Sequence, residues 1–425
     1  MQLTRMNTLL ILGAGTAGTI MANHLRRKLS RSEWNIKIVD QHPEHYYQPG
    51  FLFMPFGIYS EKDVVRPKKK FIPNGVEYIQ ATIDRIDADN NQILLEQDNT
   101  LKYDILIVAT GVQPMPDQTE GMLDDDWQKN VFEFYTFDGA RKLANRLKDW
   151  KGGRMVVHIC EMPIKCPVAP LEFTFLADTW LKQNGLRDKT EIIYVTPLSG
   201  AFTKPIASGI LSHLLDEKKI NVVTDFNIGS VNNDKHQIVS WDDRTVDYDL
   251  LVTVPTNMGD PMLERSGLGD ELNFIATDRH TLQSKAQKNI FAIGDTTDAP
   301  TSKAGSVAHF EAEVLTENIL HYIRGEELQS RFDGHANCFI ESGEGKGFLL
   351  DFNYNLEPVP GKFPIPGIGP MNLLGQSKMN HWGKMAFKWI YWHVLLRGLP
   401  IPLVSHKMSL AGKHIPEGAL KPEAA

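Results

Sequence analysis

The feature that most constrains the fold is a glycine-rich turn near the amino terminus. Its three glycines have the spacing G-x-G-x-x-G and are Gly13, Gly15 and Gly18. A short apolar run precedes the turn, and a helical pattern follows it. A second apolar run then ends in Asp40, an acidic residue placed to accept a ribose hydroxyl. This order is typical of a strand–turn–helix unit that binds a dinucleotide, with its pyrophosphate on the helix amino terminus.

Each glycine of the turn has its own physical role. Gly13 permits the tight turn, Gly15 lets the backbone approach a pyrophosphate, and Gly18 allows the helix to pack closely on the strand. A lone glycine turn is weak evidence for a nucleotide site. Here the strand, the helix and the acid are all in place, so the sequence predicts a Rossmann unit.

Two later apolar strands also end in turns of small residues. The first leads to Thr110 and Gly111, and the second leads to Gly294 and Asp295. Together with the amino-terminal turn, these segments resemble the two-dinucleotide-domain flavoproteins, the class that contains disulfide reductases and NADH:quinone oxidoreductases. The resemblance implies FAD as the cofactor, with Asp295 near its ribityl chain. A helix expected to begin at Gly305 would point its positive end toward the isoalloxazine.

A second nucleotide unit, which such flavoproteins use for NAD(P)H, lacks its binding features here. The expected strand over 154–159 is followed by Cys160 and Cys166 and by no glycine turn. The next strand, over 191–195, ends without the acid that would hold a ribose. These departures argue against a nicotinamide substrate, and they leave thiols where the phosphates would lie.

The chain as a whole resembles the sulfide:quinone oxidoreductases. The match is carried by Cys166 with the Pro-Val-Ala-Pro that follows it, by a distant Cys338 next to Phe339, and by a basic amphipathic tail. The residues that the resemblance places around the flavin, besides the turns above, are Gln48, Pro49, Lys303 and Gly305. Many members have a further cysteine just after the first of the two later strands, whereas here Cys160 lies six residues before Cys166.

The resemblance implies that Cys166 and Cys338 form the redox pair, with Cys338 facing the flavin and Cys166 carrying a persulfide. Hydrosulfide would attack their disulfide by thiol exchange, and the freed thiolate would reduce the flavin. Because Pro167 is favourable in a first helical turn, we expect Cys166 to lie at a helix amino terminus that lowers its thiol pKa. The alternative is that these cysteines are small buried hydrophobes.

Three further residues lie near the cysteines in the sequence, and two of them have two interpretations. Glu172 is either a proton shuttle beside the reacting sulfur or a first-turn acid favoured by the helix dipole, and both interpretations stay open. Cys160 is a candidate sulfur carrier, although burial at a strand end is the simpler interpretation. His158 is expected to be a packed core histidine.

The last hundred residues are not expected to form another nucleotide domain. Residues 358–370 contain five prolines and three glycines, which predicts an irregular connector. A short helix follows, with tryptophans at helical spacing and with Lys384 and Lys388 on another side. From Gln376 onward there are seven basic and two acidic residues. This pattern suits a membrane interface, and a core or dimer helix is the alternative.

The tail is expected to seat the flavin pocket against a bilayer that supplies the quinone. Removal of residues from Gln376 onward should then release the protein from membranes without loss of FAD. The side chains that would sandwich and polarise the quinone ring are predicted mainly from the family resemblance. They are Phe339, Phe348, Phe352 and Lys378. The basic run over 66–70 is expected to be a solvated loop.

These observations predict an α/β protein with two Rossmann-like domains and a carboxyl-terminal amphipathic, membrane-binding region. The FAD domain is discontinuous, over 6–113 and 258–325; the second domain, over 114–257, carries Cys160 and Cys166; and the tail region covers 326–425. A net charge of −7 gives no reason to expect nucleic acid as a partner, and three cysteines are too few for a zinc site, so no metal is expected.

The sequence also predicts where the protein acts. It shows no cleavage-site pattern at the amino terminus and no apolar run long enough to span a bilayer, so we expect a peripheral protein on the cytoplasmic side of the cell membrane. Whether the protein forms a homo-oligomer is left open by the sequence. The alternatives to sulfide oxidation with quinone are a type II NADH:quinone oxidoreductase, a flavocytochrome-type sulfide dehydrogenase and a redox-inactive FAD-binding regulatory protein.

Overall fold

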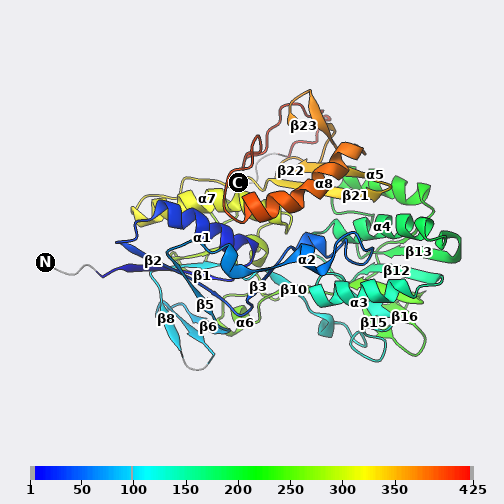
Figure 1. Ribbon diagram of the computed structural model, residues 1–425, viewed down its shortest axis with the longest axis horizontal. Coiled ribbons are helices and arrows are strands. Elements are labelled where there is room, and N and C mark those ends of the chain that lie inside the picture. The colour runs from blue at the N-terminus through cyan, green and yellow to red at the C-terminus, as the bar shows by residue number, and fades with distance from the viewer. Residues whose placement is uncertain (1–4, 97–98, 422–425) are drawn as a thin grey trace.

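The amino-terminal apolar run forms the middle strand of a five-stranded parallel sheet. The computed structural model describes residues 5–96 and 99–421 of the chain (Figure 1). The strands of this first sheet, in spatial order, are β20 (Ile290–Ala292), β9 (Ile105–Val108), β1 (Asn7–Leu12), β2 (Trp34–Asp40) and β5 (Val76–Gln80). Because β20 comes from much later in the chain than its neighbours, the sheet is built from two separate segments, as predicted.

Two helices cover one face of this sheet. They are α1 (Thr16–Lys28), which follows the glycine turn, and α7 (Gly305–Ile323), and they lie side by side along the top of the sheet (Figure 1). The predicted helix start at Gly305 is confirmed.

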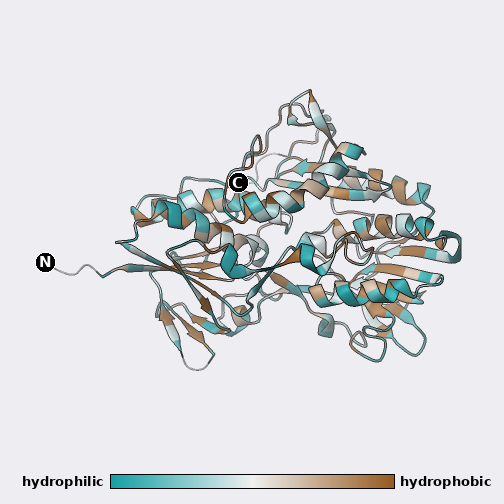
Figure 2. Cartoon of the chain, viewed as in Figure 1, coloured by the Kyte–Doolittle hydropathy of each residue, from teal (hydrophilic) through white to brown (hydrophobic). Residues whose placement is uncertain are grey.

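A second five-stranded parallel sheet is formed by the middle of the chain. Its strands, in spatial order, are β11 (Val131–Phe132), β18 (Leu250–Val254), β12 (Gly153–Ile159), β13 (Thr190–Val195) and β14 (Asn221–Val223). The helices α3 (Phe137–Lys148), α4 (Ala169–Gln183) and α5 (Pro205–Glu217) cover one of its faces, and a small sheet over 228–247 covers the other. The strands of both parallel sheets are mainly apolar (Figure 2), because both faces of each sheet are buried; the second face of the first sheet lies under the segments over 83–95 and 262–265. The two sheets confirm the predicted α/β class.

A third layer, formed by the carboxyl-terminal part, lies across the top of both sheets (Figure 1). Its mixed sheet has the order β21 (Ala336–Gly343), β22 (Lys346–Phe352), β24 (Gly369–Leu373) and β23 (Gly361–Ile365). The helix α8 (Lys378–Ile390) continues into a π-helical turn, η6 (Tyr391–Leu395).

The prediction of an irregular connector over 358–370 is wrong, because this segment forms the hairpin of β23 and β24. Pro364 and Pro370 lie directly opposite each other in it. Pro364 lies on an edge strand, and β24 pairs with β22 only at Leu373, beyond Pro370. Prolines are tolerated at such positions because no ladder hydrogen bond is required of them.

Short hairpins and single turns of helix complete the structure. The remaining strands are β3 (Glu44–Tyr46), β4 (Val65–Pro67), β6 (Ile83–Asp87), β7 (Gln92–Leu95), β8 (Thr100–Lys102), β10 (Val112–Pro114), β15 (Ile228–Asn232), β16 (Gln237–Ser240), β17 (Thr245–Asp247) and β19 (Asn257–Gly259). The two short helices are α2 (Glu61–Val64) and α6 (Met262–Arg265).

The tail is part of the core and not a detachable appendage. Tyr391, Trp392, Leu395 and Leu396 are buried in the same apolar cluster as the strands of the first sheet. Burial of a large apolar side chain contributes about 1.5–3 kcal/mol. Removal of residues from Gln376 onward would therefore uncover the layer formed by the first sheet, α1 and α7, which is called the FAD layer below. Retention of FAD after this truncation stays a prediction, and the burial of these four residues argues against it.

Candidate functional site

The glycine turn has the geometry that a dinucleotide requires. Gly13 has a φ of +91°, and a Cβ at Gly18 would lie 1.9 Å from the carbonyl oxygen of Gly13, so a side chain at Gly18 would clash with the turn. A Cβ at Gly15, by contrast, would meet nothing within 4 Å. Helix α1 begins at this open position with no side-chain cap, so its first N–H groups are available to a pyrophosphate.

The carboxylate of Asp40, at the end of β2, is bound by a backbone N–H and by a lysine. Asp40 accepts a hydrogen bond of 2.7 Å from the backbone N–H of Ala14 and forms an ion pair with Lys68. The solvated loop expected over 66–70 is thus wrong at Lys68, which is buried. Arg66 of the same run lies over the ring of Trp392, at 4.6 Å from its centroid.

The other predicted cofactor turns follow the carboxyl ends of β9 and β20. Thr110 Oγ1 lies 3.4 Å from Thr296 Oγ1, and a Cβ at Gly111 would meet open space. The N–H of Gly294 donates to the buried Glu311 at 2.7 Å, and burial raises the pKa of Glu311 to about 8. Burial also raises the pKa of the Asp295 carboxyl.

Lys303 holds one of these turns with its own side chain. Its ammonium donates to the carbonyl oxygens of Asp295 and Thr297, at 2.8 Å each. The ammonium therefore shapes the backbone around Asp295. A direct contact of Lys303 with a cofactor stays a prediction.

Consecutive residues before α7 connect the two predicted redox cysteines. The N–H of Cys166 donates to the carbonyl oxygen of Lys303 at 2.7 Å, and Ser302 Oγ lies 3.9 Å from Cys338 Sγ. Cys166 comes from the loop between β12 and α4, and Cys338 from β21. The fold thus brings thiols from two layers to the start of α7, at the carboxyl edge of the strands, where ligands of such sheets bind. Both are free thiols in this structure.

The prediction of a lowered thiol pKa at Cys166 is wrong. Helix α4 begins at Ala169, and Cys166 lies before it in a left-handed conformation with a φ of +47°. Burial, reinforced by the carboxyl of Glu172, raises the pKa of Cys166 to about 12. Burial likewise raises the pKa of Cys338 to about 11. The cation of Lys384 opposes the shift at both thiols.

A buried ion pair stands beside the thiols. Glu172 Oε1 accepts from Lys384 Nζ at 2.5 Å and from the N–H of Glu341 at 2.7 Å. Its other oxygen, Oε2, is buried and has no hydrogen-bond partner in the part of the chain that the structure describes. Burial raises the pKa of Glu172. Burial also acts to lower the pKa of Lys384, but the negative charges of Glu172 and Cys166 outweigh this effect and raise it.

Lys384 is the residue that sequence reasoning missed. The sequence places it on another side of the tail helix from the tryptophans without giving it a role, but its side chain is only 11% exposed and also donates to the carbonyl oxygen of Phe339 at 3.1 Å. Lys388 likewise turns inward and pairs with Asp63 at 2.8 Å. The available signal was periodic, since Lys384 shares a helical stripe with the buried Asn380 and Tyr391.

The loop before Cys166 carries a second lysine beside the site. Lys165 Nζ donates to Gln48 at 2.9 Å, and the electrostatic neighbours of Lys165 include Asp295 and Cys166. Tyr135 fixes the loop by donating from its hydroxyl to the carbonyl oxygen of Cys166 at 3.1 Å. Pro49 follows Gln48 in the turn after β3, as predicted for the proline-containing loop.

Cys160 is separate from this group. Its sulfur lies 3.4 Å from Thr253 Oγ1 and 3.9 Å from His158 Nδ1, and both Cys160 and His158 are buried between β12 and β18. Burial raises the pKa of Cys160 to about 11 and lowers the pKa of His158 to about 3. The expectation of a packed core histidine is confirmed.

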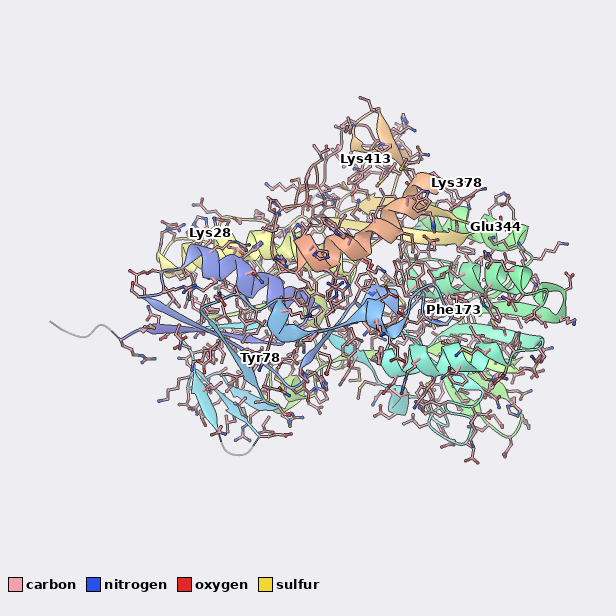
Figure 3. All side chains as sticks on the ribbon, viewed as in Figure 1. Lys28, Tyr78, Phe173, Glu344, Lys378 and Lys413 are labelled. Atoms are coloured by element: carbon pink, nitrogen blue, oxygen red, sulfur yellow. The ribbon has the colours of Figure 1, made fainter. Side chains whose placement is uncertain are left out.

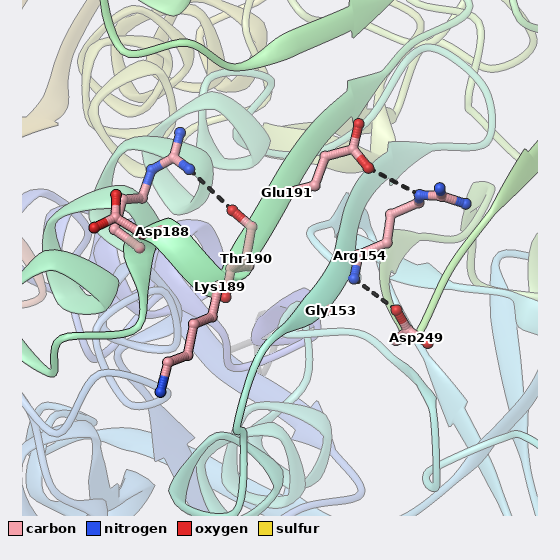
Figure 4. Close-up of a pocket in the computed structure, with 8 residues that line it drawn as sticks. Gly153, Arg154, Asp188, Lys189, Thr190, Glu191 and Asp249 are labelled. Carbon is pink, nitrogen blue, oxygen red and sulfur yellow. Dashed lines mark hydrogen bonds and ion pairs between the residues drawn. The ribbon is translucent and has the colours of Figure 1, made fainter.

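A surface cavity of about 580 Å³ lies at the other end of the second sheet (Figure 4). It is lined by the first residues of β12 and β13, among them Arg154 and Glu191, which pair at 3.0 Å. Asp249 accepts from the N–H of Arg154 at 2.7 Å. Because this cavity opens at the amino ends of the strands, it is not the candidate site.

Comparison with known proteins agrees with the site. Residues 7–159 match the family model for pyridine nucleotide-disulphide oxidoreductases. The mitochondrial sulfide:quinone oxidoreductase of Dictyostelium discoideum is 27% identical over 406 residues, covering 93% of this chain and 87% of that protein. The mouse enzyme of the same name is 26% identical over 395 residues, covering 92% and 86%. The crystal structure of the sulfide:quinone oxidoreductase of Aquifex aeolicus aligns with a TM-score of 0.76 at 20% identity, covering 92% of each chain.

The chain resembles the sulfide:quinone oxidoreductases over nearly its whole length. The resemblance predicted from the cysteines and the tail is thereby confirmed. The matched family model also supports the predicted cofactor, FAD, and an oxidoreductase activity.

The residues expected at the quinone of a sulfide:quinone oxidoreductase do not gather in one place. In the β21–β22 ladder, Phe348 and Phe352 share a sheet face with Cys338, whereas Phe339 lies on the opposite face. Phe339 packs against α8, where a Cβ at Gly383 would lie 2.8 Å from its ring. Lys378 is exposed at the outer end of α8 (Figure 3), so Lys384 is the lysine of this helix that lies near the thiols.

Proposed function

We propose that this protein oxidises sulfide to sulfane sulfur at Cys166 and Cys338 and passes the two electrons through FAD to a membrane quinone. The observation that carries the proposal is the convergence of Cys166, Cys338, Glu172 and Lys384 at the start of α7. Cys166 and Glu172 lie near each other in the sequence, whereas Cys338 and Lys384 come from the carboxyl-terminal layer.

The residues present fit FAD. The open position above Gly15 and the uncapped start of α1 suit its pyrophosphate. Gln48, Pro49, Thr110, Gly111 and Asp295 are proposed to contact the rest of the cofactor, since Gln48 binds Lys165 beside Cys166 and Thr110 lies 3.4 Å from Thr296, next to Asp295. When bound, FAD supplies a two-electron acceptor that can pass its electrons on to a quinone.

The sulfur step uses the oxidised pair, a disulfide between Cys166 and Cys338. Hydrosulfide attacks the Cys166 sulfur, so a new S–S bond forms on Cys166 and the bond to Cys338 breaks. Sulfide sulfur is oxidised to the sulfane level, and the disulfide is reduced to one persulfide and one thiolate. The two electrons gained by the pair reside on the Cys338 thiolate. When Cys338 gives two electrons to the flavin, its sulfur forms an S–S bond with the outer sulfur of the Cys166 persulfide, which releases its proton, so that a trisulfide bridge results.

Glu172 and Lys384 prepare both sulfur atoms for this exchange. The vacant Oε2 of Glu172 can accept the proton that hydrogen sulfide or a thiol releases, and its raised pKa makes it a competent base. The cation of Lys384 stabilises a thiolate at either cysteine, against burial, which disfavours it. Cys160 is too deeply packed to be the first acceptor of sulfide, and it is proposed only as a store for sulfur.

The proposal assigns 6–113 and 258–325 to the FAD domain, 114–257 to the thiol-bearing domain and 326–425 to the quinone- and membrane-facing region. Phe339 and Lys384 are the quinone contacts that the geometry favours, with Phe348 and Phe352 on the Cys338 side of the sheet.

A bilayer is proposed as the surface on which the protein works, on the cytoplasmic side of the cell membrane. Among the residues that the structure describes, no helix has the length and apolar composition to cross one. The outer face of α8 presents Trp382, 65% exposed, and Trp389, 61% exposed, and the β23–β24 hairpin presents the exposed Ile365 and Ile368. Exposed tryptophans and apolar hairpin residues are suited to a lipid interface.

The test is anaerobic stopped-flow of the purified yellow protein. We expect sulfide to bleach the oxidised-flavin absorbance and decylubiquinone to restore it, whereas NADH leaves it unchanged because β12 ends in Cys160 and not in a glycine turn. Bleaching by NADH and not by sulfide would favour a type II NADH:quinone oxidoreductase. Bleaching by neither would favour a regulatory flavoprotein.

A further inference from the structure

A tyrosine of the tail contacts the glycine turn directly. The hydroxyl of Tyr391 lies 2.7 Å from Thr16 Oγ1 and 2.7 Å from His45 Nε2. Tyr391 belongs to η6, and only 1% of it is exposed. Thr16 is the first residue of α1, next to Gly15, so the tail reaches the residue at which a pyrophosphate would meet the helix.

The Tyr391 hydroxyl links the other two polar groups, and it also lies 3.4 Å from the carbonyl oxygen of Tyr46. Burial lowers the pKa of His45 to about 3, so its imidazole is neutral at physiological pH and offers one donor and one acceptor. The Tyr391 hydroxyl can donate to one neighbour while it accepts from the other. Loss of this hydroxyl would therefore leave His45 Nε2 and Thr16 Oγ1 short of a partner in a buried place.

Thr16 also lies near the start of α7, the other helix that covers the first sheet. A Cβ at Gly305, the first residue of α7, would lie 4.0 Å from Thr16 Cγ2. The methyl group of Thr16 is thus near the start of α7, and its hydroxyl is bound by the tail. Because α1 has no side-chain cap and no acid in its first turn, the Tyr391 hydroxyl is an external group that fixes this end of the helix.

Further hydrogen bonds hold the tail on the same helix. Asn23 Nδ2 donates to the carbonyl oxygen of Leu396 at 3.1 Å, and Arg27 donates to that of Arg397 at 2.9 Å. The segment after α8 therefore follows α1 along its length. A π-helical turn is typical of a place where a helix is distorted for a local function, and here it turns Tyr391 and Trp392 inward.

We propose that Tyr391 is a positioning residue that locks the FAD cradle, so that the tail controls how fast the cofactor is released. The hydroxyl acts through Thr16: it orients the first turn of α1, whose N–H groups bind the pyrophosphate. This inference rests on the proposal that the turn from Gly13 to Gly18 holds FAD. It adds a role for the tail that is separate from membrane contact.

The test compares FAD release from the full-length holoprotein. Tyr391→Phe keeps the ring and removes the hydroxyl, and Thr16→Val removes the partner hydroxyl. Tyr103→Phe is the matched control, because Tyr103 is buried in the FAD layer and its hydroxyl has no hydrogen-bond partner among the described residues. Release is followed as the rise of free-FAD fluorescence after dilution into chaotropic salt, and urea unfolding of each apoprotein is measured alongside.

We expect Tyr391→Phe and Thr16→Val each to release FAD about tenfold faster, and the double variant to be no worse than either one, since both remove one shared contact. Tyr103→Phe should match the wild type. Release at the wild-type rate from both Tyr391→Phe and Thr16→Val overturns the inference, as does a loss of apoprotein stability with unchanged FAD affinity. A wild-type protein that binds no added FAD overturns the proposed function, and this inference with it.

Discussion

At the scale of single residues, Lys384 matters most for the chemistry. It opposes the burial that raises the pKa of both Cys166 and Cys338. Lys384→Met should raise both thiol pKa values further and leave the Glu172 carboxyl without its cation. We expect sulfide-driven flavin reduction to fall by about tenfold or more, since one pKa unit corresponds to about 1.4 kcal/mol.

Lys388→Met is the matched control for this change, because Lys388 lies on the same helix and pairs with Asp63, away from the thiols. Stopped-flow bleaching by sulfide should be close to the wild-type rate in that variant. Equal rates in the two variants would contradict the role of Lys384.

Glu172 should determine the acid side of the pH profile. Burial raises the pKa of its carboxyl above the ordinary value, and it acts as a base only when deprotonated. The rate of flavin reduction by sulfide should therefore fall as the pH drops through that raised pKa. Glu172→Gln should be slow and should lose this acid limb. An unchanged limb in the variant would show that another group titrates there.

At the scale of elements, the glycine turn and the start of α1 form the FAD cradle. A Cβ at Gly15 meets open space that FAD would occupy, so an indole there should exclude the cofactor. We expect Gly15→Trp to purify colourless. The control is Gly209→Trp, because Gly209 also faces open space but lies on the exposed side of α5. Full flavin content in Gly15→Trp, read from the visible spectrum, would refute the assignment.

The outer face of α8 is the element proposed to meet the membrane. Removal of the whole tail would not test this, since Tyr391 and Trp392 belong to the core. Replacement of both Trp382 and Trp389 by Gln removes only exposed apolar surface. We expect binding to anionic liposomes to weaken by about tenfold or more, with FAD retained.

Trp241→Gln should leave liposome binding unchanged, because Trp241 is 80% exposed on a turn of the second sheet layer, away from α8. Co-sedimentation measures all three proteins. A double Trp382 and Trp389 variant that still pellets like the wild type would require another docking surface.

At the scale of the whole molecule, the features that the sequence predicts correctly are those that a short segment determines by itself. The glycine turns, the strand that ends in Asp40, the strand that leads to the turn with Asp295, and the start of α7 all follow from short segments. The resemblance also led to Cys166 and Cys338, which the fold does bring together.

Apart from the local hairpin of β23 and β24, the errors concern contacts between distant segments. Lys68 is buried because Asp40, on another strand, pairs with it, and Lys384 is buried because Glu172 of another layer lies opposite. The helical pattern of α8 does not show which of its sides faces Glu172, because Glu172 lies about two hundred residues away in the chain. The pKa of Cys166 was predicted with the wrong sign for the same reason, since burial in the assembled layers outweighs the nearby helix end.

The central claim is that Cys166 and Cys338 together carry the sulfur chemistry of the whole assembly. The measurement that tests it most directly is the rate of flavin bleaching by sulfide in Cys166→Ser, Cys338→Ser and Cys160→Ser. A hydroxyl can neither carry a persulfide nor leave as a soft anion, so the first two variants should lose the reaction by several orders of magnitude. The Cys166 and Cys338 double variant should be about as slow as either single one. Cys160→Ser should keep substantial activity, and quinone should still reoxidise chemically reduced flavin in every variant. Normal bleaching in Cys166→Ser with none in Cys160→Ser would contradict the account.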